Sequence, residues 1–331
     1  MAETPAVSII IPVKPGGRVS ALSRLPAVEY PSPSIEVIVA EGRQPSLQRN
    51  RAAGAAQGEI LYFLDDDSQS SADFLRRTVR HYTDPSVGAV GGPSLTPDSD
   101  SILQHSFSLA FTSPFGGGGM RNRYRQTGAV RETRDSELIL CNLSFRRDLF
   151  IAYGGFDERL YPNEENELME RIRRGGGRLI HDPGLAVYRS QRPTLAAFCR
   201  QLFGYGRGRG EQTVLSGVVK PVTFVPTLFL LYLLSLPLAH KAVYYLPLLC
   251  YLVVTAGSAV NAVFRSGRPA SAALLPVVLP LFHLCYGAGM VKGLVSPRWK
   301  GGRSAAGGVT LRRVKEFGKE WEPESRDSGL V

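Results

Sequence analysis

The last third of this sequence restricts the fold more than any other part. No Asp or Glu occurs between Glu211 and Glu316. This acid-free stretch contains three apolar segments, at roughly 221–239, 243–264 and 271–294. Apolar helices of about 20 residues are long enough to cross the ~30 Å hydrocarbon core of a bilayer. Three of them in succession would make an unusually apolar water-soluble domain, so we predict a membrane module over residues 212–295.

The net charge of +10 does not indicate a nucleic-acid-binding protein. Residues 212–331 hold 13 Lys and Arg against 5 Asp and Glu, whereas residues 1–211 are nearly balanced, with 26 against 24. The excess positive charge therefore accompanies the apolar segments, where basic residues are drawn to anionic lipid headgroups. We expect membrane lipid, and no nucleic acid, as the partner of this region. Residues 296–331 are expected to form a basic, polar and poorly ordered tail.

The orientation of the membrane module is less well determined by the sequence. The N-terminal stretch MAETPAVSIIIPV lacks the features of a signal peptide, so we expect the chain to begin on the cytosolic side. The positive-inside rule also places Arg207, Arg209, Lys220, Arg265 and Arg268 in the cytosol, together with the basic tail. Three full spans would instead put the tail outside. Two or three spans, one of them re-entrant, remain open from the sequence.

The first 190 residues alternate between strand-like and helix-like segments. Short apolar runs predict strands at 7–13, 35–40, 59–64, 87–92, 138–146 and 178–181. Helices are predicted over 47–56, 71–82 and 164–174. Buried strands that alternate with helices are typical of a mostly parallel sheet covered on both faces. We therefore predict an α/β fold for a cytosolic domain of residues 1–211, with ligands bound near the carboxyl ends of the strands.

The strongest local signal is the run Asp65-Asp66-Asp67, directly after the third predicted strand. Three adjacent carboxylates repel one another, so a compensating cation is expected. Mg²⁺ is usually held by one or two carboxylates together with substrate phosphates and water. The sequence favours a metal–diphosphate site here over a solvated acidic turn that caps the next helix.

Two further segments carry possible chemistry. Glu164 and Glu165 begin the helix predicted over 164–174, where acidic residues complement the helix dipole. If one of them faces the aspartates, it is a candidate general base for an attacking hydroxyl. The glycine- and arginine-rich segment 201–209 precedes the apolar stretches. Its arginines fit either lipid headgroups or a diphosphate, since a guanidinium binds phosphate oxygens in pairs.

Several ordered motifs resemble the family 2 glycosyltransferases with the GT-A fold, over roughly residues 6–210. Each motif is loose, but their order and spacing together are specific. They lie at residues 7–12, 49–60, 65–67, 90–92, 141–158, 164–168 and 201–209. The last one is similar to the segment before the membrane helices in exopolysaccharide-type members of the succinoglycan glucosyltransferase kind.

The resemblance implies roles for individual residues. The nucleotide sugar would contact Pro12, Glu41, Asn50, Asp65, Asp66, Arg207 and Arg209. The metal, Mg²⁺ or Mn²⁺, would be held by Asp67 and Asp65, and the catalytic base would be Glu165, with Glu164 as the alternative. The acceptor side would include Asn142, Gly155, Phe156, Asp157 and Gln201.

The activity implied by the resemblance is an inverting, metal-dependent transfer of a sugar. The donor would be a nucleotide diphosphate sugar, with a UDP-sugar favoured, and the acceptor a polyprenyl-linked or polysaccharide hydroxyl. The Gln-x-x-Arg-Trp motif of processive synthases is absent from the sequence, so we expect transfer of single residues. The expected location is the inner (plasma) membrane, as a multi-pass protein with a cytosolic catalytic domain.

Three departures from the family pattern keep other functions open. Glu41 begins an unusual turn, Glu165 stands where the family has Asp, and Arg189 stands where many members have His. A membrane-anchored nucleotide-sugar-binding scaffold without catalysis is therefore one alternative. A nucleotidyltransferase is another, although the sequence has only a faint echo of the expected glycine-rich loop after its first strand.

Overall fold

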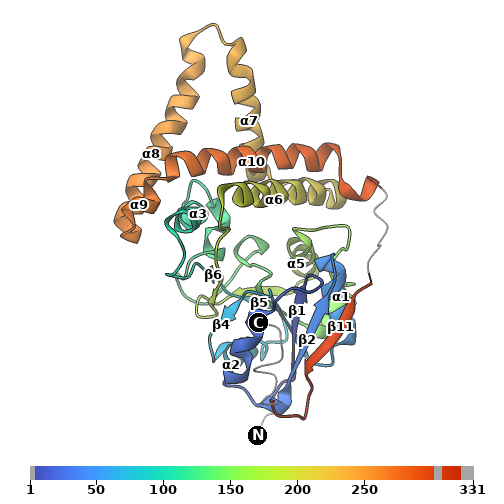
Figure 1. Ribbon diagram of the computed structural model, residues 1–331. Coiled ribbons are helices and arrows are strands. Elements are labelled where there is room, and N and C mark those ends of the chain that lie inside the picture. The colour runs from blue at the N-terminus through green and yellow to red at the C-terminus, as the bar shows by residue number, and fades with distance from the viewer. Residues whose placement is uncertain (1–3, 302–307, 322–331) are drawn as a thin grey trace. The chain divides into compact units, whose positions relative to one another are not determined.

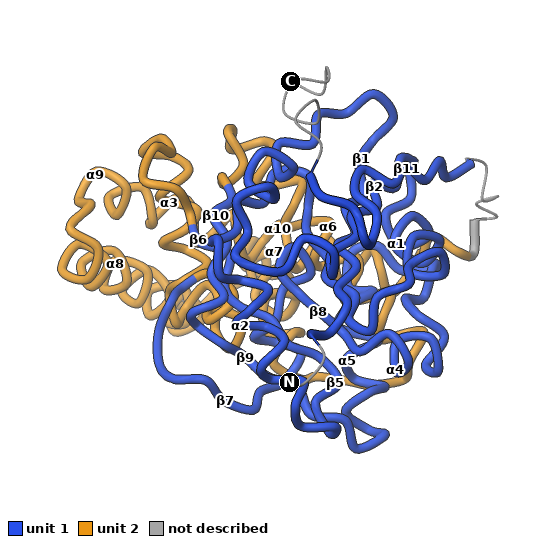
Figure 2. Tube along the Cα trace, turned by 90° about the horizontal axis from the view of Figure 1, so that it is seen from below, with its two compact units in different colours: residues 1–95, 125–189, 304–331 blue, residues 96–124, 190–303 orange. Residues whose placement is uncertain are grey.

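The structure is a computed structural model that describes residues 4–301 and 308–321. Its residues gather into two compact units, coloured blue and orange in Figure 2. The first unit contains Met1–Leu95, Arg125–Arg189 and Ser304–Val331, and the second contains Thr96–Tyr124 and Ser190–Arg303. This grouping differs from the consecutive division into 1–211, 212–295 and 296–331 that composition predicts. The chain passes from one unit to the other four times, which a composition profile does not detect.

The first unit is built on an eight-stranded sheet with the order β11-β2-β1-β3-β8-β5-β9-β7. Its strands are β1 (Val7–Val13), β2 (Ile35–Glu41), β3 (Ile60–Leu64), β5 (Val87–Gly91), β7 (Arg131–Glu132), β8 (Asn142–Arg146), β9 (Arg178–His181) and β11 (Thr310–Lys315). Strands β2, β1 and β3 are mutually parallel, as are β5 and β9. Strand β8 lies antiparallel between β3 and β5. The α/β prediction is confirmed, with a sheet that is mixed rather than mostly parallel.

Helices cover both faces of this sheet, as predicted. The bounds are η1 (Ser20–Ala27), η2 (Ser32–Ser34), α1 (Pro45–Ala55), α2 (Phe74–His81), η4 (Asp135–Glu137), α4 (Arg147–Ala152) and α5 (Glu164–Arg174). Alternate residues of β1 enter opposite layers of the core, because successive side chains of a strand point to opposite faces. Ile9 packs in one layer with Phe74 of α2, and Ile10 packs in the other with Leu168 of α5.

A small second sheet joins three distant segments of the same unit. It has the order β4-β10-β6, from β4 (Gln69–Ser70), β10 (Val187–Tyr188) and β6 (Ser94–Leu95). Tyr188 of β10 pairs with Gln69 of β4. This pairing brings residue 189 beside the acidic turn that precedes β4.

The predicted poorly ordered tail contains a strand instead. Residues Thr310–Lys315 form β11, which pairs antiparallel with β2 at the edge of the large sheet (Figure 1). Arg313 donates from Nη1 to the buried Glu36 carboxylate at 2.5 Å. Charged residues are common on edge strands, where they discourage further pairing. The basic composition of this strand therefore concealed it from a sequence analysis.

The second unit is helical. Its elements are α3 (Ile102–Thr112), η3 (Gly118–Arg123), α6 (Leu195–Ser216), η5 (Pro221–Phe224), α7 (Val225–Ser235), η6 (Leu236–Leu238), η7 (Ala242–Tyr245), α8 (Leu246–Ser266), α9 (Pro269–Ala272), α10 (Leu275–Val295) and η8 (Arg298–Gly301). Three helical segments are long and apolar enough to cross a membrane: Pro221–Leu238, Ala242–Ser266 and Leu275–Val295. They coincide with the three predicted segments.

The glycines of the 201–209 segment serve helix packing. Gly206 and Gly210 of α6 lie against the backbone of α10, with no room for a Cβ, and Gly289 and Gly293 of α10 lie equally close to α6. Small residues spaced four apart let two helix backbones approach closely. Gly206 and Gly210 of this segment thus hold α10 close to α6.

Candidate functional site

The three parallel strands β2, β1 and β3 end side by side. Val13 of β1 is in register with Glu41 of β2, and Pro12 with Ala40. Gln48 of α1 ties the two strand ends together by donating to the carbonyl oxygens of Val13 and Ala40 at 2.8 and 2.6 Å. The carboxyl ends of parallel strands are where α/β sheets bind ligands. Pro12 and Glu41, which sequence analysis assigns to the nucleotide sugar, therefore lie at one edge of the sheet.

The acidic run follows β3 at this edge. Asp65 and Asp66 are partly buried and Asp67 is exposed. Burial, together with the neighbouring Asp67 and Asp65 carboxylates, raises the pKa of Asp66. Three adjacent carboxylates repel one another and are stabilised by nearby positive charge. Two arginines lie close enough to provide it.

The first arginine is Arg189, which follows β10. Its Nε donates to Asp67 Oδ1 at 2.5 Å, and its Nη2 lies 3.3 Å from Asp65 Oδ2. One guanidinium thus bridges the first and third carboxylates of the run. The pairing of β10 with β4 places it there, because β4 begins two residues after Asp67.

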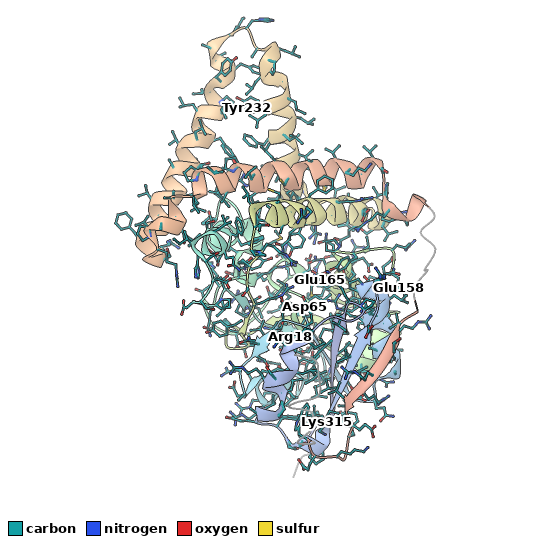
Figure 3. The ribbon with its side chains drawn as sticks, in the orientation of Figure 1. Arg18, Asp65, Glu158, Glu165, Tyr232 and Lys315 are labelled. Atoms are coloured by element: carbon teal, nitrogen blue, oxygen red, sulfur yellow. The ribbon has the colours of Figure 1, made fainter. Side chains whose placement is uncertain are left out.

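The second arginine is Arg49 on α1. Its Nη2 donates to Asp65 Oδ1 at 2.9 Å, and its Nη1 donates to Glu164 Oε1 at 2.9 Å. Arg49 therefore links the acidic turn to the first residue of α5. Figure 3 shows Asp65 and Glu165 near each other on the ribbon, as this bridge requires.

The two glutamates at the start of α5 differ in their environment. Glu164 is 1% exposed and Glu165 is 7% exposed. Burial and the adjacent Glu165 raise the pKa of Glu164 to about 8, although the Arg49 guanidinium opposes that shift. Glu165 Oε1 accepts from Asn166 Nδ2 at 3.1 Å. Because Glu164 is held by Arg49, Glu165 is the better candidate for a base that meets an acceptor.

The carboxylates fit a metal that arrives with a diphosphate. Within residues 4–301 and 308–321, no cluster of three or more His, Cys, Asp or Glu is arranged to hold a metal ion by itself. Asp65 and Asp67 nevertheless converge on a single cationic centre, the guanidinium of Arg189. Two carboxylates with phosphate and water ligands are typical of Mg²⁺ sites. Arg189 must move for a metal to take the same carboxylates.

Asn50 organises the segment that follows α4. Its side chain accepts from the Phe156 amide at 2.9 Å and donates to the Phe156 carbonyl at 2.8 Å and to Glu158 at 3.0 Å. Gly155 has a φ of +69°, and a Cβ there would lie 2.7 Å from the Asn50 side chain. Phe156 is buried against Phe63, with ring centroids 5.2 Å apart. Asn50 thus fixes the expected acceptor-side segment in place.

Two expected acceptor residues have internal partners instead. Asn142 is fully buried, and its amide accepts from Tyr62 Oη at 2.5 Å and donates to the carbonyl of Leu185. It begins β8, opposite Leu64 at the end of β3, so it braces the strand end from inside the sheet. Direct contact of Asn142 with an acceptor is therefore not supported. Asp157 pairs with Arg159 at 2.7 Å.

The remaining predicted residues belong to the second unit. Gln201 donates to Tyr205 Oη at 2.8 Å, Arg207 donates to Glu211 at 3.1 Å, and Arg209 donates to Gln212 at 2.7 Å. Arg209 is buried within that unit. Each of these side chains has a partner on its own helix. Contact of Arg207 and Arg209 with the donor, and of Gln201 with the acceptor, stays a prediction.

Known proteins are similar in sequence to a segment that holds part of this site. Residues 22–154 match the family model described as glycosyl transferase family 2. Over this segment the chain is similar to glycosyl transferase family 2. The match includes α1, β3 and the acidic run, and it ends before α5.

Curated proteins are also similar to part of this chain. The succinoglycan biosynthesis protein ExoA of Rhizobium meliloti is 27% identical over 203 residues, which are 53% of this chain and 60% of that protein. The glucosyl-dolichyl phosphate glucuronosyltransferase of Haloferax volcanii is 30% identical over 118 residues, 35% of this chain and 36% of that one. The chain thus spans less than two thirds of these relatives.

A solved structure supports the fold. The mannosyltransferase PcManGT of Pyrobaculum calidifontis, in complex with GDP-Man and Mn²⁺, aligns with a TM-score of 0.54 and 17% identity. The alignment covers 89% of this chain and 88% of that one. At this identity the similarity shows the GT-A type of fold alone.

Sequence analysis missed the two arginines of the site. Arg49 lies in the motif of residues 49–60, where only Asn50 was assigned a role. Arg189 was noted as standing in the place of a histidine and was given no function. Two carboxylate-rich segments with no assigned counter-charge are the signal that could have prompted a search for them.

Proposed function

We propose that this chain is an inverting, metal-dependent glycosyltransferase. It would move one sugar from a nucleotide diphosphate sugar to the hydroxyl of a lipid-linked or polysaccharide acceptor, at the cytosolic face of a membrane. The observation that carries the proposal is the Asp65–Arg49–Glu164 bridge. It joins a strand-end carboxylate run, suited to a metal-bound diphosphate, to a helix start that bears a second, separate carboxylate.

The chemistry is a single displacement at the anomeric carbon. Glu165 accepts the proton of the acceptor hydroxyl as the new oxygen–carbon bond forms, and the bond to the diphosphate oxygen breaks with its electron pair on the nucleoside diphosphate. Attack on the face opposite the leaving group inverts the configuration. A divalent cation on Asp67 and Asp65 would supply positive charge to that leaving group.

The arginines of the site have complementary tasks in this proposal. Arg49 holds Asp65 and Glu164 in fixed positions, because its two Nη atoms each donate to one of them at 2.9 Å. Arg189, once displaced from the aspartates, would donate to the diphosphate. Guanidinium groups bind phosphate oxygens strongly because both partners are charged.

The test is a donor screen with the full-length chain in lipid nanodiscs. UDP-, GDP- and dTDP-sugars are supplied with Mn²⁺ or Mg²⁺ and a lipid-linked acceptor extract, and both nucleoside diphosphate release and transfer of labelled sugar into the lipid fraction are measured. We expect both signals with one donor and their joint loss in Glu165→Gln. Release of pyrophosphate instead would identify a nucleotidyltransferase and overturn the proposal.

One observation favours a second function. The Arg189 guanidinium already neutralises the carboxylates that a metal would use. A protein that binds nucleotide sugar without turnover could keep this arrangement permanently. Donor binding by the wild-type chain, with no transfer from any donor in the screen, would support that scaffold function.

A further inference from the structure

We propose that residues 221–266 cross the bilayer as one helical hairpin, α7 and α8, and that α10 does not cross it. Two crossings then leave the first and last described segments on the same membrane face. This inference concerns the attachment of the chain to a lipid bilayer and does not depend on the transferase reaction.

The first step is the pairing of β11 with β2. Thr310 is in register with Glu41 and Arg312 with Val39. One sheet therefore contains a strand that precedes residues 190–303 in the sequence and a strand that follows them. A sheet cannot be divided by a bilayer. The chain between residues 190 and 303 must therefore cross the membrane an even number of times, and three crossings are excluded.

The second step is to decide which helices cross. In the most apolar 18-residue stretch of each segment, 6% of Pro221–Leu238 and 11% of Ala242–Ser266 are buried, against 50% of Leu275–Val295. Large apolar side chains stand outward on the first two segments, including Leu228, Leu234, Val253 and Phe264 at 62%, 66%, 63% and 83% exposure. Contiguous apolar surface of this kind marks an interaction site. Acyl chains are the occupant that matches two helices exposed on nearly all sides.

Helices α7 and α8 pack as a pair. The rings of Phe229 and Tyr251 stack with centroids 4.1 Å apart, and Tyr232 Oη donates to the Tyr244 carbonyl at 2.8 Å. Figure 1 shows the two helices extending away from α10, joined at the end far from it and diverging towards it. The pair is therefore one insertion unit rather than two independent spans.

Helix α10 has a different partner. It runs beside α6 (Figure 1), and the glycines of both helices hold their backbones in contact. Helix α6 carries the fully buried Glu211, which pairs with Arg207 at 3.1 Å and with Arg298, just after α10, at 2.6 Å. Charged residues are costly in the hydrocarbon core. The α6–α10 pair therefore stays at the membrane surface or outside it.

The charges and lengths of the hairpin agree with a full crossing. Lys220 precedes the first segment, and Arg268, which follows the second, pairs with Asp98 at 2.6 Å. The turn between the helices contains His240, Lys241 and a non-helical backbone. Polar backbone must reach headgroups or water, since nothing in the acyl region can satisfy it. A helical segment of 18 residues is about 27 Å long, close to the hydrocarbon thickness.

The test compares epitope tags in intact and permeabilised spheroplasts. Separate full-length chains carry one tag at the N-terminus, at the C-terminus, after Lys241 or, as a matched internal control, after Gly267. We expect only the tag after Lys241 to bind antibody in intact cells, and all four to bind after permeabilisation.

Two outcomes would overturn the inference. Exposure of the C-terminal tag with protection of the N-terminal one would show an odd number of crossings. Protection of the tag after Lys241 would show a re-entrant hairpin that does not reach the far face. The terminal tags lie outside the described elements, so the parity test stands even if an internal insertion prevents folding. For that case, impermeant maleimide labelling of Lys241→Cys, with the wild-type chain as background, replaces the internal tag.

Discussion

Arg189 donates from Nε to the carboxylate of Asp67 at 2.5 Å, so a protein side chain stands where a catalytic cation would be needed. The same guanidinium reaches Asp65 at 3.3 Å. A metal and Arg189 cannot both use these oxygens. If the donor binds here with a metal, as we propose, one positive charge would be exchanged for another.

Arg189→Ala should strengthen metal binding in the absence of donor. Removal of a competing ion pair that contributes about 0.5–1.4 kcal/mol corresponds to an increase in Mn²⁺ affinity of about two- to tenfold. The measurement is free Mn²⁺ by electron paramagnetic resonance. The same variant should bind the nucleotide sugar more weakly, because a phosphate ligand is lost.

Arg178→Ala is the matched control for that experiment. Arg178 also bridges two carboxylates, Asp84 at 2.7 Å and Glu132 at 2.8 Å, and it lies elsewhere in the sheet. Its loss should leave Mn²⁺ affinity unchanged. Equal Mn²⁺ affinity in Arg189→Ala and wild type would contradict the competition.

Glu165→Gln should lower the rate of sugar transfer by about 10²- to 10⁴-fold, the usual contribution of a general base. Donor affinity, measured by calorimetry, should remain. Glu164→Gln is the matched control, because its carboxylate is occupied by Arg49. If Glu164→Gln loses more activity than Glu165→Gln, the roles of the two residues are exchanged.

Glu164 should make the stability of the chain depend on pH. Burial raises its pKa in the folded chain from an ordinary value of 4.5 to about 8, so the folded state binds this proton more tightly than the unfolded state. Its contribution to stability is therefore complete below about pH 4.5 and is lost as pH rises towards about 8.

The check is the melting temperature of wild type and Glu164→Gln from pH 5 to 9. A neutral glutamine cannot titrate, so wild type should lose stability relative to the variant as pH rises, by about 2–4 °C for each kcal/mol. A difference that is constant across this range, or that grows in favour of wild type, would show that the Arg49 pair keeps Glu164 ionised throughout.

Gly155→Ala should destabilise the chain more than Gly154→Ala. Both residues have positive φ, +69° and +76°, so each substitution introduces backbone strain of about 1–2 kcal/mol. Only at Gly155 would the new Cβ meet Asn50, at 2.7 Å, and Phe150, at 3.1 Å. We expect a further ~1–3 kcal/mol there from overpacking.

Chemical unfolding curves of both glycine variants measure that difference. Because Asn50 holds the acceptor-side segment, Gly155→Ala should also raise the KM for the acceptor. Equal unfolding free energies for the two variants would mean that the Asn50 side chain moves aside for the new Cβ without loss of stability.

Arg313→Ala should detach the last strand. Glu36 is fully buried and accepts from Ser8 at 2.6 Å and from the Gln57 amide at 2.6 Å, but Arg313 supplies its charged partner. Leaving a buried charge with neutral donors alone costs about 1–3 kcal/mol. Amide hydrogen exchange of β2 should then increase.

The neighbouring Arg312 provides the control for the last strand. Its side chain is exposed, and Arg312→Ala should leave exchange in β2 close to wild type. If Arg313→Ala exchanges no faster than Arg312→Ala, the strand is held by backbone pairing alone.

The sequence predicts the strands and helices of the first unit well, because their apolar periodicity is local. It predicts the sheet order less well. Strand β8 is antiparallel between β3 and β5. The sequence of residues 142–146 does not indicate which strands it pairs with or in which direction. Pairing between distant strands depends on how the sheet and its helices pack in three dimensions. A single sequence indicates such pairing only where a short turn fixes the register.

The same limit applies to the candidate site. Asp65 and Asp67 were predicted from their position after a buried strand, which is a local feature. The contacts of Arg189 depend on β10 meeting β4, more than a hundred residues apart in the chain. Asn142 looked like a site residue because a motif resembled the family's, and only its full burial shows that it braces the strand end.

The position of β11 sets an order of events during biosynthesis. Strand β2 leaves the ribosome early, yet its outer edge gains a neighbour only after residue 315 has been made, when both helices of the hairpin already exist. Until then the sheet presents a bare edge to solvent. Completion of the sheet thus shows that the whole second unit has been translated, and a chain truncated within that unit would be left open to proteolysis or aggregation.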